Sequence, residues 1–402
     1  MKWETRPIKN VYEGLYDGPH ATPPTSDSGA IFLGISNISE DGRLDFSDIK
    51  YISENDLARW TKRIVPRGGD IVFSYEATLN RYAIIPEGFH GCLGRRMALI
   101  RPNEQVVLGQ FLYYYFFSEQ WRSTIAENTV IGATVDRIPL TKFPDFPVSI
   151  PELDIQKKIV DILSAYDNLI ENNQKQIKLL EEAAQRLYKE WFVDLRFPGY
   201  ETTPVVNGVP DGWEKHSFSE KVSIMSGGTP KTELKEFYGG GIPFYSPKDH
   251  DGSFFAFKTE ASITEAGLAN CNSSLFPENT IIITARGTVG KTVLLAVPMA
   301  MNQSCYALKC DELNLPYYLF FALNAEVQKL KAMSNGGVFN TIIVKTFDNI
   351  QIVFPSNGLA FRFEEKVSPI MEQIKAKMQE NMLLTEARDR LLPKLMSGEI
   401  EV

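Results

Sequence analysis

The sequence predicts an α+β protein in which two tandem α/β domains are separated by two long helices that form an antiparallel coiled coil. Three observations support this architecture. The chain is self-similar with a period of about 210 residues, each repeat ends in a long segment of regularly spaced apolar residues, and the rest of each repeat reads as short strands and turns. We therefore expect a pseudo-twofold internal repeat.

The repeat rests on matches that occur in one order along the chain. At an offset of 210, the matches include Trp3 with Trp213, Ser36 with Ser246, Asp41 with Asp251, and Gly42 with Gly252. Later the offset shortens to 204, where TVDRIPLTKFPDFPVSIP at 134–151 lies over VFNTIIVKTFDNIQIVFP at 338–355. Each match is weak alone, but their common order indicates a tandem duplication.

Each repeat divides into a domain and a helix. The domains are expected at 1–151 and 197–355, where β-branched and aromatic runs alternate with Gly, Pro and Asn, a composition typical of short strands and turns. The helices are expected at 152–196 and 356–402. Each opens near a proline, which suits the first turn of a helix.

Apolar residues recur along both helices at the 4,3 spacing of a coiled-coil seam. In the first helix the pattern has one slip and includes Ile162 and Leu169, and Asn173 and Asn381 fall in or near the seam. The residues we assign to the coiled coil and to subunit docking are Ile159, Tyr166, Ile177, Leu187, Trp191, Phe363, Ile374, Leu384 and Leu391. Pro369 is expected to interrupt and kink the second helix. In the alternative arrangement, each helix is buried against its own domain.

Composition excludes several classes of protein. The longest apolar run, FLYYYFF at 111–117, is too short to span a membrane, and the first ten residues do not resemble a signal peptide. Four cysteines are too few for a disulfide framework, so we expect a cytoplasmic protein that does not enter the membrane. With 42 basic and 50 acidic residues, the net charge is −8, and any DNA-binding face must be local.

No motif for catalysis or metal binding withstands inspection. The segment ARGTVGKT at 285–292 nearly fits a phosphate-binding loop, but the residues after it read as a strand where such a loop needs a helix. FYGGG at 237–241 fits a methyltransferase loop, but the [DNS]PP[YF] tetrapeptide of those enzymes is missing. Cys271, Cys305 and Cys310 suit buried structural roles better than a zinc site. We predict no catalytic residues, no metal site and no cofactor on this chain.

What remains is a set of polar and basic residues on turns in both domains. Arginine suits guanine edges, asparagine and glutamine suit adenine edges, and lysine suits phosphates. The candidate DNA-binding residues are Ser36, Thr78, Arg81, Arg95 and Arg96 in the first domain, and Thr229, Lys231, Ser246, Lys248, Arg286, Lys291, Asn302 and Gln303 in the second.

Together with the repeat and the helices, several motifs give the chain a close resemblance to the specificity (S) subunits of type I restriction-modification systems. The motifs are YKEWFVD at 188–194, VPDGW at 209–213, SGGTP at 226–230, IPFYSPKD at 242–249, RGTVG at 286–290, Asn302-Gln303, and RLLPKLMSG at 390–398. The first repeat departs from this pattern, with EATLN at 76–80 in place of RGTVG and GRR at 94–96 in place of NQS.

The resemblance implies two target recognition domains, each of which reads one half of a split double-stranded DNA site. It also implies that the helices dock two methyltransferase (M) subunits, and that S-adenosylmethionine, ATP and Mg are bound by M and restriction (R) subunits. Two alternatives stay open at this point. One is an S subunit that serves a methyltransferase without a nuclease partner, and the other is a two-headed scaffold that binds protein instead of DNA.

Overall fold

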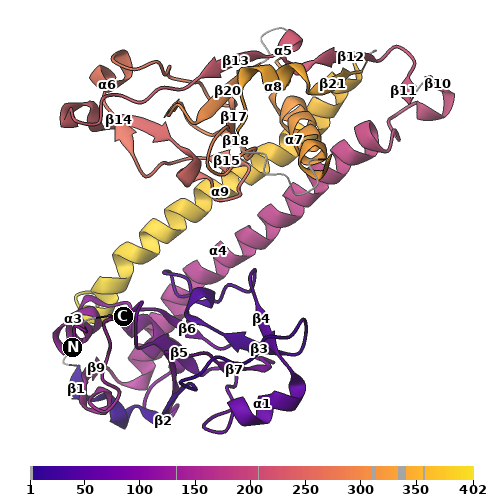
Figure 1. Ribbon diagram of the computed structural model, residues 1–402. Helices are drawn as coiled ribbons and strands as arrows, with labels where there is room; N and C mark the ends of the chain where they lie inside the picture. The colour runs from indigo at the N-terminus through magenta and orange to yellow at the C-terminus, as the bar shows by residue number, and fades with distance from the viewer. Residues whose placement is uncertain (1–2, 133, 207, 310–313, 334–340, 356–357) are drawn as a thin grey trace. The chain divides into compact units, whose positions relative to one another are not determined.

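In the computed structural model, which describes residues 3–132, 134–206, 208–309, 314–333, 341–355 and 358–402, the chain forms two compact units (Figure 1). One unit comprises residues 1–170 and 383–402, and the other comprises 171–382. Each unit therefore contains one predicted domain together with half of each long helix. The domain boundaries predicted from the sequence, which keep the helices separate, remain predictions.

The first domain contains two small sheets and a strand pair. A four-stranded antiparallel sheet has the order β2-β8-β5-β6, a three-stranded sheet has the order β4-β3-β7, and β1 pairs with β9. The strands are β1 (Glu4–Pro7), β2 (Tyr12–Asp17), β3 (Ala30–Leu33), β4 (Lys50–Ile52), β5 (Ile71–Ser74), β6 (Tyr82–Ile84), β7 (Gly91–Leu93), β8 (Met97–Pro102) and β9 (Pro147–Ile150). The helices are α1 (Glu54–Trp60), α2 (Gly109–Tyr115) and α3 (Glu119–Asn128).

The second domain repeats this topology. Its sheets have the orders β13-β20-β17-β18-β15 and β16-β14-β19, and β12 pairs with β21 as β1 does with β9. The strands are β12 (Glu214–Ser217), β13 (Ser223–Ser226), β14 (Tyr238–Tyr245), β15 (Phe255–Ala256), β16 (Ser262–Ile263), β17 (Ile281–Thr284), β18 (Thr292–Leu295), β19 (Ala300–Met301), β20 (Cys305–Lys309) and β21 (Gln351–Phe354). The helices are α5 (Phe218–Lys221), α6 (Glu265–Ala269), α7 (Pro316–Met333) and α8 (Val344–Asp348), and a hairpin of β10 (Val205–Val206) and β11 (Val209–Pro210) precedes them.

The duplication predicted from the sequence is confirmed by this shared strand order. In both domains a parallel pair, β3 with β7 and β14 with β19, joins strands that are far apart in the sequence. Only the second domain adds a fifth strand, β15, to its larger sheet.

The long helices are α4 (Leu153–Tyr188), which continues into a π-helical turn at Lys189–Val193, and α9 (Leu359–Ser397). α9 stays helical through Pro369, so the interruption predicted there is wrong. The helices pair antiparallel within each unit. In the first unit, Arg388 of α9 donates to Asp167 of α4 at 2.6 Å, and in the second, the side chain of Asn173 donates to that of Asn381 at 3.0 Å.

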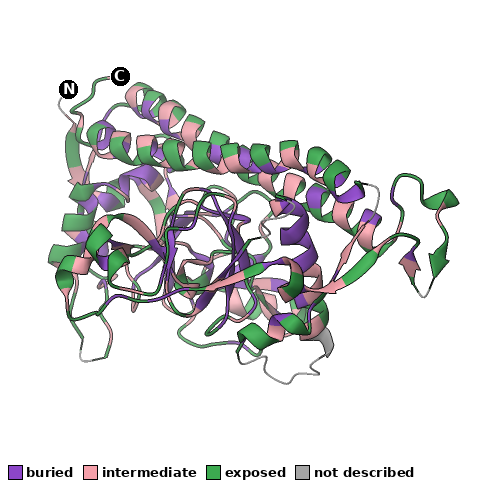
Figure 2. Ribbon diagram, turned by 90° about the horizontal axis from the view of Figure 1, so that it is seen from above, coloured by how far each residue is buried: buried purple, intermediate pink, exposed green. Residues whose placement is uncertain are grey.

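The seam of α4 differs from the predicted one in its N-terminal half. Leu163 is fully buried and Ile170 is 2% exposed, whereas Leu169, which we placed in the seam, is 48% exposed. An uninterrupted heptad through Leu163, Ile170 and Ile177 therefore replaces the predicted slip. Figure 2 shows the resulting buried and exposed faces of the long helices.

Most of the other predicted seam residues belong to the hydrophobic cores of the two units or pack against them: Ile159, Ile177, Leu187, Trp191, Phe363, Ile374 and Leu391. Tyr166 and Leu384 are partly buried and belong to neither core. Ile159 and Leu163 join the core of the first unit with Leu392 and Leu395 of α9. In the second unit the core takes in Ala184 and Trp191 with Phe363, Val367 and Ile374. Each helix is also buried against its own domain. Pairing of the helices with each other and burial of each helix against its own domain, which the sequence presents as alternatives, therefore occur together.

A side chain from each long helix caps the helix that follows the larger sheet. In the first unit, Gln156 accepts from the backbone N–H of Leu108, at the start of α2, at 2.9 Å. In the second unit, Glu364 accepts from the backbone N–H groups of Tyr317 and Tyr318, at the start of α7, at 3.1 and 2.8 Å. Burial raises the pKa of Glu364 to about 7, although these two hydrogen bonds oppose the shift.

We expect Leu163→Ala to destabilise the protein by about 2–5 kcal/mol, because it leaves a cavity in a closed core. Leu169→Ala makes the same chemical change on an exposed position and should cost less than about 1 kcal/mol. The free energy of unfolding in urea measures both. Equal losses would show that the helix presents a different face to its partner.

A second prediction concerns Glu364. Its pKa in the folded chain lies above its ordinary value, so the folded state binds the proton more tightly, and the free energy of unfolding should fall as the pH rises from about 4.5 to 7. The loss should be on the order of 2 kcal/mol. Glu364→Gln cannot ionise, so the difference in stability between wild type and variant should change over this pH range. Parallel curves for the two proteins would contradict the assignment.

Candidate nucleic-acid interface

Equivalent loops follow β5 and β17, at 74–81 and 284–291, and contain several predicted binding residues. The backbone N–H of Ser74 donates to Arg81 O at 3.0 Å, as that of Thr284 donates to Lys291 O at 2.8 Å. The hydroxyls of the same two residues donate to the backbone oxygens of Thr78 and Thr288. The two loops therefore have the same hydrogen-bonded frame, although few of their side chains agree.

Positive φ angles recur at matching positions in these loops. They are 72° at Ala77 and 79° at Gly287, and 60° at Asn80 and 71° at Gly290. Glycine adopts this region without strain, whereas alanine does so at a cost. The first domain thus has the same loop conformation, with alanine and asparagine where the second domain has two glycines.

In the second domain the predicted binding loops lie next to one another. The backbone N–H of Asn302 donates to Tyr245 O at 2.9 Å, and that of Ala285 donates to Ser304 O at 2.7 Å. The hydroxyl of Thr229 donates to the side chain of Gln303. The turns at 226–231, 246–249, 286–291 and 302–304 are thereby brought together in one cluster, which we call the second loop cluster.

Some of the predicted residues in this cluster have structural roles. The hydroxyl and backbone N–H of Ser246 both donate to Asp249, at 2.7 and 2.8 Å, and Asn302 accepts from the backbone N–H of Ser304 at 2.9 Å. In the described part of the chain, Lys231, Lys248, Arg286 and Lys291 are exposed and their side chains make no hydrogen bond or ion pair. These four side chains, with that of Gln303, are available to a ligand.

The first domain has a matching cluster, in which the turn at 94–96 adjoins β3 through a hydrogen bond from Gly94 N to Leu33 O at 2.7 Å. Two of its predicted arginines face carboxylates: Arg81 lies 2.7 Å from Glu40, and Arg96 lies 3.5 Å from Glu76. Arg95, Ser36 and Thr78 are exposed. The sequence did not reveal these ion pairs, because Glu40 is distant from Arg81 along the chain.

The loop at 284–291 does not bind phosphate through its backbone. The N–H groups of Gly290 and Lys291 already donate to the carbonyl and the hydroxyl of Thr284, at 2.8 and 3.0 Å. The chain then enters β18, a strand, as the sequence predicted. Both features rule out a nucleotide-binding loop of the GxxxxGK[ST] type.

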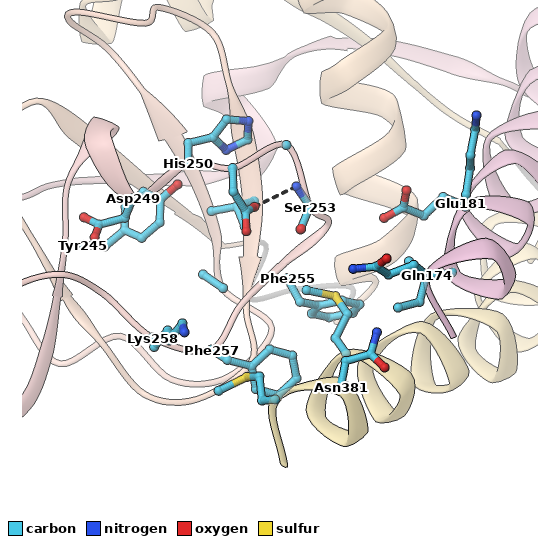
Figure 3. Close-up of a pocket in the computed structure, with 18 residues that line it drawn as sticks. Gln174, Glu181, Tyr245, Asp249, His250, Ser253, Phe255, Phe257, Lys258 and Asn381 are labelled. Atoms are coloured by element: carbon cyan, nitrogen blue, oxygen red, sulfur yellow. Dashed lines mark hydrogen bonds between the residues drawn. The ribbon is translucent and has the colours of Figure 1, made fainter. Parts of the chain in front are cut away.

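A pocket of about 430 Å³ lies between the long helices and the segment 249–258 of the second unit (Figure 3). Gln174 and Glu181 of α4 and Asn381 of α9 line it, opposite His250 and Lys258. Burial raises the pKa of Glu181 to about 6. No sequence motif marks this pocket, because its residues come from three separate stretches of the chain.

Neither a metal centre nor a membrane segment is found among the residues that the structure describes. They contain no group of His, Cys, Asp and Glu suited to a metal ion, and no helix apolar and long enough to cross a membrane. Cys92 and Cys305 are buried free thiols and Cys271 is partly buried. Cys310, the third member of the zinc site that we weighed, lies outside the described residues.

Two loop clusters with different side chains lie on one repeated scaffold, an arrangement typical of a protein with two binding domains. The family model for the type I restriction modification DNA specificity domain matches residues 2–182 and 210–376. The chain therefore belongs to this family and contains two DNA-recognition domains. It is a specificity subunit, the non-catalytic, DNA-recognising component of a type I restriction-modification system.

Individual relatives agree with this assignment. The chain is 27% identical over 412 residues to the type I restriction enzyme HindI specificity subunit of Haemophilus influenzae, covering 86% of this chain and 89% of the relative. It is 26% identical over 360 residues to the MjaIX specificity subunit of Methanocaldococcus jannaschii, covering 87% and 82%. The fold resembles the crystal structure of an S subunit from M. genitalium, with a TM-score of 0.59, 16% identity, and coverage of 98% and 96%.

The positive φ angles lead to a reciprocal prediction. Gly287→Ala should lower the free energy of unfolding by about 1 kcal/mol, because the nearest atom to the added methyl group is at 3.9 Å and only the backbone is strained. Ala77→Gly, at the equivalent position, should raise it by roughly 0.5–1 kcal/mol. Urea denaturation of both variants measures the changes. If the two changes have the same sign, the loops do not share one backbone conformation.

Proposed function

We propose that each domain reads one half of a split, double-stranded DNA site through its own loop cluster. The observation that carries this proposal is the common hydrogen-bonded frame of the loops at 74–81 and 284–291, which holds different side chains in the two domains. Two domains that recognise different DNA sequences need the same loop backbone with different polar side chains. Arg286 and Gln303 are of the types that contact guanine and adenine edges.

We further propose that the two long helices dock two methyltransferase subunits. Most of the seam residues that we assigned to docking are buried in the cores of the two units, so a partner would contact the outer faces of the helices. Leu179 of α4 and Leu383 of α9 are 65% and 61% exposed and are suitable contacts. In this proposal S-adenosylmethionine is bound by the methyltransferase subunits, ATP and Mg by restriction subunits, and the complex acts on DNA in the cytoplasm.

The proposal is tested by mapping methylation in cells that express the chain together with its methyltransferase subunit. Arg286→Ala or Gln303→Ala should weaken recognition of one half-site by about 1–3 kcal/mol and leave the other half-site unchanged, as expected for a bidentate base contact. Arg95→Ala should affect only the opposite half. Arg362→Ala, on the exposed face of α9, is a matched control.

Three other outcomes separate the alternatives. Methyl transfer by the purified chain alone would contradict a non-catalytic role. If DNA binding does not respond to Arg286→Ala, Gln303→Ala or Arg95→Ala, the proposed reading surface is wrong, and a scaffold that binds protein becomes the better interpretation. Split-site methylation without ATP-dependent cleavage in the complete complex would indicate a methyltransferase that works without a nuclease.

A further inference from the structure

A short segment of the first domain carries a concentration of positive charge outside the candidate DNA-binding residues discussed above. Residues 59–67, RWTKRIVPR, contain four basic side chains, Arg59, Lys62, Arg63 and Arg67, and no acidic one. All four are exposed. The segment begins in the last turn of α1 and ends before β5. We call it the basic segment.

Carboxylates of the first domain face two of these side chains. Arg63 is paired with Asp17, which also lies 3.0 Å from His20, and Arg67 lies 3.6 Å from Glu13. The side chains of Arg63 and Arg67 remain 51% and 62% exposed. Because ion pairs this exposed are weak, both arginines can exchange their partner for another anion.

The other two basic side chains, Arg59 and Lys62, face no carboxylate. Within the described part of the chain, neither side chain makes a hydrogen bond or an ion pair. The guanidinium carbon of Arg59 lies 5.8 Å from the ring centre of Trp60, which packs against the core residues Ile52 and Cys92. An aromatic face attracts a cation without neutralising it, so Arg59 keeps its charge beside a fixed ring.

The basic segment lines a pocket of about 380 Å³ in the first domain. It contributes Arg59, Trp60, Lys62 and Arg63 to the lining, opposite the residues 17–21 at the end of β2. Among the described residues that line the pocket, Asp17 is the single carboxylate, against three cationic side chains and one histidine. The pocket is therefore suited to an anion.

The pocket adjoins the turn at 94–96, which contains two of the candidate DNA-binding arginines. The guanidinium of Arg63 donates to the backbone oxygen of Gly18 at 3.4 Å, and the N–H of Gly18 donates to the backbone oxygen of Met97 at 2.7 Å. A methyl group added to Gly18 would lie 2.4 Å from the backbone oxygen of Gly94, so the two turns are in direct contact. The basic segment is thus continuous with the loop cluster of the first domain.

Charges from both places also act on the side chain of Tyr75, which is 6% exposed and whose hydroxyl has no hydrogen-bond partner among the described residues. Burial and the carboxylates of Asp17 and Glu76 raise the pKa of Tyr75, and the guanidinium groups of Arg63 and Arg95 oppose the shift. Arg63 of the basic segment and Arg95 of the loop cluster therefore lie near the same hydroxyl.

The second domain has no counterpart of this charge. At the offset of 211 that aligns α1 with α6, the basic segment lies over NCNSSLFPE at 270–278, where Pro277 coincides with Pro66 and no residue is basic. The one charged residue of that stretch, Glu278, is paired with Lys375 of α9. Because the same scaffold supports both segments, the fold does not require the positive charge of the basic segment. That charge calls for an explanation in terms of a ligand.

We propose that the basic segment binds the phosphate backbone of duplex DNA through Arg59, Lys62 and Arg63, and that it gives the first domain a sequence-independent contact that the second domain lacks. The inference rests on the proposed function, since the adjoining loop cluster must face a duplex. Contacts to phosphates position a protein on DNA without reading its sequence, and lysine and arginine supply most of them. In a chain with a net charge of −8, such a contact has to be local.

The test measures duplex binding by the full-length chain in complex with its methyltransferase subunits, over a range of salt concentrations. Arg59→Met and Lys62→Met should each weaken binding roughly three- to tenfold at low salt and lower the slope of log K against log salt by about 1. The loss should be equal for duplexes with and without the half-site sequences, and the methylated sequence should not change. Lys142→Met is the matched control, since it removes one exposed charge from the same domain outside the pocket.

A scan of single phosphates locates the contact. Methylphosphonate linkages, each of which removes the charge of one phosphate, are placed one at a time along the duplex. Neutralising a phosphate that the basic segment binds should weaken binding by the wild type and leave binding by the double variant Arg59→Met/Lys62→Met nearly unchanged, because the two partners of one interaction are not additive. We expect such phosphates only beside the half-site whose recognition Arg95→Ala alters.

The proposal is overturned if Arg59→Met and Lys62→Met bind duplex as Lys142→Met does while Arg95→Ala still alters one half-site. That result leaves the proposed function intact, because half-site reading is followed separately by the methylation map. It is also overturned if the two variants no longer assemble with the methyltransferase subunits, which would assign the basic segment to a protein partner.

Discussion

The antiparallel pairing of α4 and α9 is the constraint on which both units depend. The hydrophobic core of the first unit combines the domain with Ile159 and Leu163 of α4 and Leu395 of α9, and the core of the second likewise draws on both helices. Each domain is therefore completed by residues from the far end of the chain or from the other repeat. The helices are thus part of the hydrophobic core of each unit and not only connections between the domains.

Polar contacts inside this pairing determine its register. In the first unit, Arg388 is 8% exposed and bonds to Asp167, which also accepts from the hydroxyl of Tyr114 on α2 at 2.5 Å. In the second, Asn173 bonds to Asn381 and Glu380, both at 3.0 Å. A buried polar group that loses its partner costs more than an apolar mismatch, so a shift of the helices by one turn would be penalised in both units.

The duplication, the two helices and the general place of the loop clusters could be predicted from the sequence, because these features depend on spacing and turn residues. The prediction of buried helix positions failed where two adjacent positions are both apolar. Ile162 and Leu163, and Leu169 and Ile170, fit a helical stripe equally well, and only packing selects Leu163 and Ile170. The sequence also could not show that Arg81 pairs with a carboxylate from a separate loop, Glu40, because the two residues are far apart along the chain.

The same reasoning explains why duplication suits a protein that reads two different sequences. The loops at 74–81 and 284–291 are held by hydrogen bonds from the backbone and from one hydroxyl, so most of their side chains are free to change. Substitutions in these loops can then change the charge of each domain without altering the fold. The pair Glu40 and His250 is the clearest case, since one position on a common scaffold holds a carboxylate that pairs with Arg81 in the first domain and a histidine near Lys291 in the second.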